Sequence, residues 1–283
     1  MNAVLAPAKR PVRPAREPSE WVVLDCNGRP TRIEHQWLRR EDASAPLMVF
    51  LHEGLGSVSM WRDFPQALCE ALQCRGLVYS RPGYGQSSPR AADEQWTADF
   101  MHRQAHALLP ALLQALGVDT AREKPWLFGH SDGGSIALLH AAQFPDRVAG
   151  AVVLAPHILV EDVSIASITQ ARTAYETTAL RQRLAAHHAD VDSAFWGWNR
   201  IWLDPQFRSW NITAELPSIT CPLLAVQGVN DEYGTLEQVR GIARAAAQCQ
   251  LLELPDCGHS PHKDQRERLI QAVQEFFSPP PTR

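Results

Sequence analysis

The chain has 283 residues, of which 45% are hydrophobic and 20% are charged, and its formal net charge is −4. These values are typical of a globular protein, and the small negative charge gives no electrostatic reason to expect nucleic acid or an anionic membrane as a partner. No apolar run approaches the ~20 residues that span a bilayer, so we expect no membrane partner either.

The first elements of the chain are an arm and a hairpin. Residues 1–20 contain four Pro and four Lys/Arg with little hydrophobic periodicity, which predicts a flexible N-terminal arm. Segments 21–24 and 33–38 have strand patterns, and the Asn27-Gly28 pair between them is typical of a hairpin turn. Segment 47–51 is entirely apolar, as expected of a strand buried on both faces.

The rest of the chain alternates between helical and strand patterns. Helical patterns cover 61–72, 97–116, the stretch after residue 132, 236–247 and 265–277. Five further strand patterns cover 76–80, 126–128, 148–154, 223–227 and 250–254. This alternation predicts an α/β fold with one mostly parallel, eight-stranded sheet and helices on both of its faces.

One interval breaks this alternation. Residues 157–215 lie between two predicted core strands, and about 60 residues are too many for a plain connection in a compact domain. We therefore predict that they form a helical cap insertion above the strand ends, while 21–156 and 216–283 form the core. The insertion contains a cluster of tryptophans that either bind substrate or form the core of the cap: Trp196, Trp198, Trp202 and Trp210.

A sharp turn between strand and helix carries the clearest chemical signal. Residues 129–134 read Gly-His-Ser-Asp-Gly-Gly, directly after the apolar run 126–128 and before an Ala- and Leu-rich stretch. A G-x-S-x-G sequence in this context is typical of a nucleophile elbow, which exposes a serine hydroxyl above the sheet. Ser131 is therefore the candidate nucleophile.

A serine hydroxyl needs a base, and the base needs an acid to orient it. His259 is the best candidate base, because it lies in the loop between the last strand and the last helix, on the same sheet edge as the turn. Asp231 is the candidate acid, since it follows the strand 223–227. Less favoured positions are His262 and His130 for the base, and Glu232, Asp204 and Asp256 for the acid.

The oxyanion that develops during acyl transfer needs two N–H donors. The backbone N–H of Asp132, directly after the nucleophile, is one candidate. The second is expected in the loop after the strand 47–51, where either Glu53 or Gly54 supplies it.

Together these motifs resemble the α/β-hydrolase superfamily, in its cap-bearing branch of serine hydrolases. The resemblance covers nearly the whole chain beyond the arm. It rests on His52-Glu53-Gly54, on the segment 80–87 (Ser-Arg-Pro-Gly-Tyr-Gly-Gln-Ser), on the elbow, and on Asp231 and His259. It implies an α/β-hydrolase fold with a helical cap and a Ser-Asp-His triad.

Two positions depart from the common pattern of this superfamily. Glu53 stands where many relatives have the second residue of a His-Gly pair, and its carboxylate is expected to pair with Arg81 or, as the alternative, to contact substrate. The Ser-Asp-Gly-Gly form of the elbow resembles valacyclovirase-like amino acid ester hydrolases, which implies that Asp132 binds a substrate amine. The alternative is that Asp132 faces a nearby Arg or the helix N-terminus, where an acid is favoured.

The resemblance restricts the reaction but not the substrate. The leading hypothesis is hydrolysis of a carboxylic ester, lactone or thioester with a small to medium apolar or aromatic acyl group, through an acyl-enzyme. Alternatives are C–C bond hydrolysis of ring-cleavage products, amino acid ester hydrolysis, cofactor-free haloperoxidase chemistry, and a receptor or lyase on the same fold. The expected substrate contacts are Asp132, Trp196, Trp198 and Trp202.

No metal or organic cofactor is implied, because the triad and the backbone donors suffice for this chemistry. The six cysteines are scattered and contain no C-x-x-C, so free thiols in a reducing, cytoplasmic environment are expected. The expected partner is a small-molecule substrate, and the sequence gives no oligomeric state.

Overall fold

The computed structural model describes residues 18–26, 28–91 and 93–277. Residues 1–17 of the predicted arm and Asn27 of the predicted turn lie outside this part of the chain. The first strand begins at Glu20, the last residue of the predicted arm.

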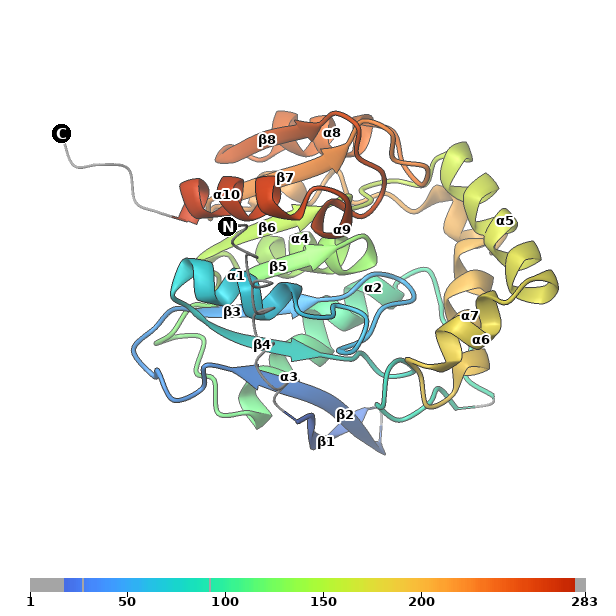
Figure 1. The fold of residues 1–283 in the computed structure, drawn as a ribbon, viewed down its shortest axis with the longest axis horizontal. Coiled ribbons are helices and arrows are strands. Elements are labelled where there is room, and N and C mark those ends of the chain that lie inside the picture. Colours follow the sequence, from blue (N-terminus) through green and yellow to red (C-terminus); the bar gives the residue numbers. More distant parts are fainter. Residues whose placement is uncertain (1–17, 27, 92, 278–283) are drawn as a thin grey trace, which may run out of the picture.

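The centre of the molecule is one eight-stranded sheet (Figure 1). The strands are β1 (Glu20–Cys26), β2 (Arg29–Leu38), β3 (Leu47–Leu51), β4 (Arg75–Tyr79), β5 (Trp126–His130), β6 (Gly150–Leu154), β7 (Leu223–Gly228) and β8 (Cys249–Leu254). Their order in the sheet is β1-β2-β4-β3-β5-β6-β7-β8. Strand β2 pairs antiparallel with both β1 and β4, whereas the strands from β4 to β8 are parallel. The predicted α/β fold with a mostly parallel sheet is confirmed.

The apolar strands bury alternate side chains on the two faces of the sheet, as the two-residue period of a strand requires. In β3, for example, Leu47, Val49 and Leu51 belong to one hydrophobic cluster. Met48 and Phe50 belong to the cluster on the opposite face. Both faces are therefore covered, and this explains why the central strands are apolar throughout.

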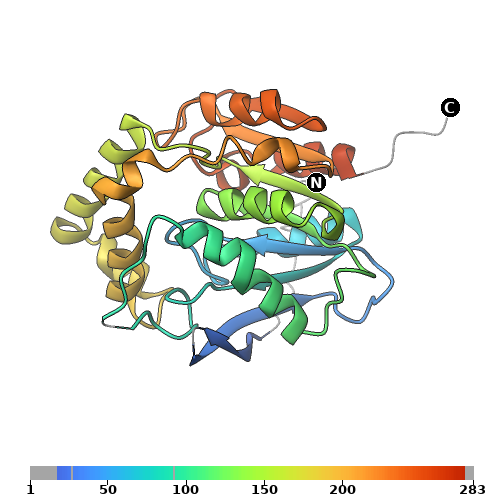
Figure 2. The same cartoon turned by 180° about the vertical axis from the view of Figure 1, so that it is seen from behind.

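Helices cover these two faces. They are α1 (Phe64–Leu72), α2 (Phe100–Arg103), the π-helical segment η1 (Gln104–Leu108), α3 (Leu109–Ala115), α4 (Asp132–Gln143), α8 (Glu237–Ala245), α9 (Pro261–Asp264) and α10 (Arg266–Phe277). Helices α1 and α10 pack against each other in front of the sheet (Figure 1), and α3 and α4 lie on the opposite face (Figure 2). The predicted helix over 97–116 is interrupted by η1, and a separate short helix α9 precedes the closing helix. No helix in the described ranges is long and apolar enough to cross a membrane.

Between β6 and β7 the chain forms three further helices beside one end of the sheet (Figure 1). These lid helices are α5 (Asp162–Thr177), α6 (Leu180–Ala185) and α7 (Val191–Trp202), followed by the short 3₁₀ turns Pro205–Ser209 and Leu216–Ser218. His188 joins this segment to the body of the molecule: its Nδ1 accepts a hydrogen bond from the Gly85 N–H (3.0 Å), and its Nε2 donates to the Leu55 carbonyl (3.0 Å). The lid helices are thus attached to the loops that follow β3 and β4.

Candidate active site

The turn from β5 to α4 has the geometry of a nucleophile elbow. Ser131 has φ 53° and ψ −121°, a strained conformation for a residue with a side chain. A Cβ atom at Gly129 would collide with the Gly133 carbonyl, and one at Gly133 would collide with the Leu51 carbonyl. The two glycines therefore let strand β5, helix α4 and strand β3 approach closely enough to hold the serine in this conformation.

His259 and Asp231 meet at the same edge of the sheet. His259 Nδ1 lies 2.8 Å and 3.0 Å from the two carboxylate oxygens of Asp231, and the Asp231 side chain is only 2% exposed. Burial raises the pKa of Asp231, but the hydrogen bond and charge of His259 outweigh it and bring the pKa below its usual value. Asp231 is therefore ionised at neutral pH and holds His259 with Nδ1–H directed at the carboxylate, which leaves Nε2 as the basic nitrogen.

The loop after β3 lies across the elbow from this pair. Asp132 is the first residue of α4, so its backbone N–H has no acceptor within the helix and is available to an oxyanion. Gly54 lies directly against the lid, because a Cβ atom there would collide with the indole of Trp198. Glycine is thus needed at position 54 for the lid to reach this loop.

The Asp132 side chain is fully buried and faces an arginine. Its Oδ1 accepts a hydrogen bond from Trp202 Nε1 (3.2 Å), and its Oδ2 lies 3.7 Å from Arg81 Nη2. Burial raises the pKa of Asp132 above its usual value, and Arg81 and Trp202 offset only part of this shift. Of the two roles expected for this carboxylate, the geometry favours pairing with an arginine.

The expected ion pair between Glu53 and Arg81 is wrong. Arg81 donates to the backbone carbonyl of Glu53 (2.9 Å), while the Glu53 carboxylate lies 3.6 Å from His130 Nδ1 and 3.9 Å from Lys263 Nζ. Burial raises the pKa of Glu53, but His130 and Lys263 together hold it well below its usual range. The prediction failed because the carboxylate within ion-pair distance of Arg81 is that of Asp132 (3.7 Å), although Asp132 is farther from Arg81 in sequence than Glu53.

His130 has a contact that the sequence analysis did not anticipate. Its Nε2 donates to the backbone carbonyl of His259 (2.7 Å), so the residue before the nucleophile supports the loop that carries the candidate base. His157 was also missed: it follows β6, and its buried ring lies 4.8 Å from Trp202 and 6.0 Å from His259. Since β6 is next to β5 in the sheet, its carboxyl end reaches the same edge.

The tryptophans of the lid divide into two groups. Trp198 and Trp202, four residues apart on α7, face the loop after β3 and the elbow, respectively. Trp196 packs within the lid against Tyr175 and Phe195. Trp210 stacks with Phe207.

The less favoured candidates make other contacts. His262 is buried beside His130, with ring centroids 4.8 Å apart, rather than at the surface. Glu232 accepts a hydrogen bond from the His259 backbone N–H through its side chain (3.2 Å). Asp204 caps the 3₁₀ turn that follows α7, and Asp256 is exposed. Among the described residues, no group of three or more His, Cys, Asp or Glu side chains could hold a metal ion.

Comparison with known proteins places this geometry in context. Residues 48–272 match the family model described as the alpha/beta hydrolase family. The chain is 27% identical to the sn-1-specific diacylglycerol lipase ABHD11 of Mus musculus, with coverage of 84% of this chain and 82% of that protein. It is 22% identical to the 2-hydroxy-6-oxo-6-phenylhexa-2,4-dienoate hydrolase of Comamonas testosteroni, over 84% and 89% of the two chains. The enol-lactonase structure from Burkholderia xenovorans LB400 superimposes with a TM-score of 0.69 at 21% identity, covering 90% of this chain and 99% of that one.

Proposed function

This chain belongs to the alpha/beta hydrolase family, and from that premise we propose that it is a serine hydrolase acting through a Ser131–Asp231–His259 triad. Its substrate is a carboxylic ester, lactone or thioester with a small to medium apolar or aromatic acyl group. Its relatives are hydrolases, which supports the reaction class.

The observation that carries this proposal is the contact of the buried Asp231 carboxylate with His259 Nδ1. It orients the imidazole so that its other nitrogen can take the proton of the Ser131 hydroxyl. The Ser131 oxygen then attacks the acyl carbonyl, and His259 returns the proton to the leaving alcohol or thiol. Water hydrolyses the resulting acyl-enzyme by the same proton transfers in reverse order.

Backbone N–H groups stabilise the oxyanion in both steps. We assign one to Asp132, at the N-terminus of α4, and the second to Gly54 or Glu53 in the loop after β3. Removal of one such donor in other hydrolases costs about 3–4 kcal/mol of transition-state stabilisation. The burial of the Asp132 side chain with Arg81 supports a fixed backbone at this position.

The acyl group is proposed to lie under α7, against Trp198, Trp202 and the newly recognised His157. Burial lowers the pKa of His157 to about 3, so its ring is neutral and adds to the largely uncharged lining. Because the Asp132 carboxylate already faces Arg81 and Trp202, we expect no preference for amino acid esters.

A second candidate is hydrolysis of a C–C bond in a ring-cleavage product. The observation that favours it is the 22% identity to the 2-hydroxy-6-oxo-6-phenylhexa-2,4-dienoate hydrolase over most of both chains. The same triad and oxyanion donors suit this reaction as well.

A substrate panel tests the proposal. Initial rates are measured with p-nitrophenyl esters of increasing acyl length, a thioester, a lactone, amino acid esters and a 2-hydroxy-6-oxo-dienoate, each with the natural chain and with Ser131→Ala. We expect turnover of short to medium esters that Ser131→Ala abolishes. Preferential turnover of the dienoate supports the second candidate, and turnover that survives in Ser131→Ala contradicts both.

We also propose a small-molecule substrate as the partner and a reducing, cytoplasmic compartment. All six cysteines are free in the structure, as expected of thiols in such a compartment.

A further inference from the structure

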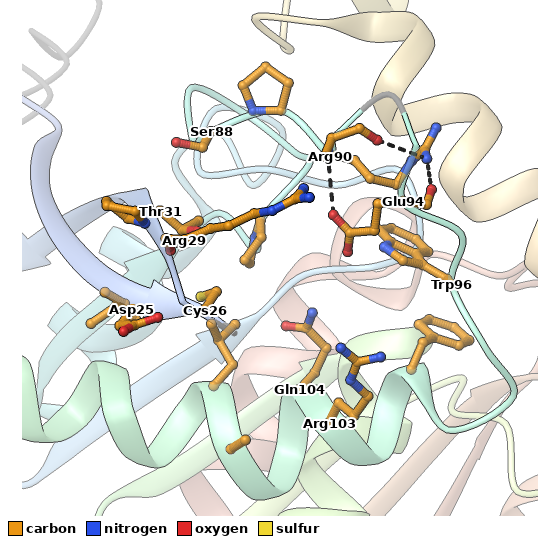
Figure 3. A pocket seen from close by; sticks show the side chains of 18 of the residues that line it. Asp25, Cys26, Arg29, Thr31, Ser88, Arg90, Glu94, Trp96, Arg103 and Gln104 are labelled. Atoms are coloured by element: carbon orange, nitrogen blue, oxygen red, sulfur yellow. Dashed lines mark hydrogen bonds between the residues drawn. The ribbon is translucent and has the colours of Figure 1, made fainter.

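A cavity of about 630 Å³ lies apart from the candidate triad (Figure 3). It is bordered by the β1–β2 hairpin, the loop from β4 to α2, and the successive helical segments α2, η1 and α3. Its lining contains none of Ser131, Asp231 and His259. Its volume is that of a pocket for a small organic molecule.

One wall of the cavity is aromatic. Trp96 and Phe100 stack with ring centroids 5.6 Å apart and planes 5° from parallel. Buried Leu24 and Leu108 extend this apolar surface. The wall suits a planar apolar group, which would bury its faces without leaving polar atoms unpaired.

The acidic groups of the lining are already engaged. Asp25 accepts a hydrogen bond from the Gly28 N–H (2.6 Å), and Asp93 pairs with Arg29 at 3.6 Å. Glu94 accepts from the backbone N–H three residues before it (3.4 Å). These carboxylates therefore offer little to a cationic ligand.

Several polar groups of the lining have no protein partner in the part of the chain that the structure describes. Arg103 and Gln104 project from the helix into the cavity, opposite Arg29 (Figure 3). Arg103 is exposed to solvent at the cavity, and its guanidinium has no hydrogen bond or ion pair within the described ranges of the chain. Arg90 Nε, a donor, and Gln104 Oε1, an acceptor, are buried and have no hydrogen-bond partner among the described residues. A buried donor without a partner is costly, so Arg90 Nε favours an occupant that carries an acceptor, such as a carboxylate.

We propose that this cavity binds a small molecule with a planar apolar body and one carboxylate, in the manner of an aromatic acid. The body lies on the wall formed by Trp96 and Phe100, and the carboxylate pairs with the guanidinium of Arg103, whose planar fork matches two carboxylate oxygens. A single negative charge fits better than a multiply charged phosphate, because Asp25, Asp93 and Glu94 line the same space.

The aromatic wall also contacts the lid helices. The ring of Trp96 lies against Gly197 of α7, since a Cβ atom there would lie 3.2 Å from it, and Trp96 also contacts Tyr84 with ring centroids 5.7 Å apart. A ligand on this wall changes the surroundings of Trp96, so binding is observable by tryptophan fluorescence. The inference does not depend on the proposed hydrolase activity.

Titration with 2-naphthoate, followed by calorimetry and tryptophan fluorescence, tests the proposal, with 2-naphthamide as the uncharged probe of the same shape. We expect one site that prefers the acid over the amide by about tenfold, the ratio for one charge-assisted contact. Arg103→Gln is expected to abolish that preference. Arg122→Gln, the same change at a side chain that is 90% exposed, is the matched control and is expected to keep it.

A second variant probes the cavity without altering charge. Ala107→Phe fills the space from the helix side and is expected to weaken both probes by at least about tenfold, with the melting temperature measured to confirm folding. Absence of 2-naphthoate binding to the natural chain overturns the proposal. So does binding that neither Arg103→Gln nor Ala107→Phe changes, because the probe then lies elsewhere.

Discussion

Replacement of Asp132 by Asn tests the pairing next to the nucleophile. Asn keeps an oxygen for the Trp202 N–H but removes the charge that faces Arg81, and both side chains of this pair are 1% exposed. At 3.7 Å and an effective dielectric constant of about 20, the lost attraction is about 4–5 kcal/mol. Arg81 keeps the Glu53 carbonyl as an acceptor, so we expect a net destabilisation of about 3 kcal/mol.

The assay is thermal and urea unfolding of the variant, together with its rates on simple and amino acid esters. For a chain of this length, about 3 kcal/mol corresponds to a fall of about 6 °C in Tm. Asp119→Asn is the matched control, because it removes a carboxylate from an exposed pair with Arg122, and it is expected to change Tm by less than about 1 °C. An Asp132→Asn variant of natural stability that selectively loses amino acid ester turnover would refute this reasoning and assign the carboxylate to substrate.

Three further variants test other parts of the account. Gly133→Ala places a methyl group against the Leu51 carbonyl. We therefore expect either an inactive chain or a loss of at least about 2 kcal/mol of stability in urea unfolding. Natural activity and stability would contradict the close approach of α4 to β3 at the elbow. Asp231→Asn is expected to lower kcat by about 10⁴-fold, measured with a p-nitrophenyl ester; a small effect would exclude it as the partner of His259. Burial lowers the pKa of His188 to about 4, whereas a histidine in the unfolded chain has a pKa of about 6.5. As the pH falls from about 6.5 to about 4, only the unfolded chain binds a proton at this position, so the folded state loses stability over this range. His188→Gln keeps a donor and an acceptor but does not bind this proton. Urea unfolding at pH 7 and pH 4.5 is expected to show that the variant loses about 2 kcal/mol less stability between these two pH values than the natural chain. An equal loss of stability in both chains would contradict the lowered pKa of His188.

The sequence was most informative where local rules are strict. Only a strained turn between a buried strand and a helix combines glycines at 129 and 133 with a serine between them, and the structure has this turn. Asp231 and His259 were predictable as neighbours, because the carboxyl ends of parallel strands share one edge of the sheet. Both predictions used the order of elements along the chain and needed no side-chain detail.

Contacts between side chains of distant segments were not predictable in this way. Arg81 faces Asp132, not Glu53, because the choice between two nearby carboxylates depends on distances that only packing sets. The contact of His130 with the His259 carbonyl was missed, since it depends on how a distant loop packs against the elbow. His157 could have been found from its position after β6, the neighbour of β5, by the same edge argument that found Asp231.

The interruption of the helix over 97–116 also lacks a signal in the pattern. Its apolar spacing continues through the π-helical segment Gln104–Leu108, although the backbone shifts there. The carbonyl of Ala105 in this segment accepts a hydrogen bond from buried His140 of α4 (2.7 Å). A contact between two helices thus accompanies a local change that helix propensity alone does not encode.

Covalent labelling with a fluorophosphonate probe shows whether Ser131 is an activated nucleophile. We expect one label per chain, located by mass spectrometry on the peptide that contains Ser131. Ser131→Ala is expected to abolish the label, and His259→Ala to slow its formation strongly, because the hydroxyl then has no base. No label on the natural chain, or an undiminished label in Ser131→Ala, would contradict the role of Ser131 as nucleophile.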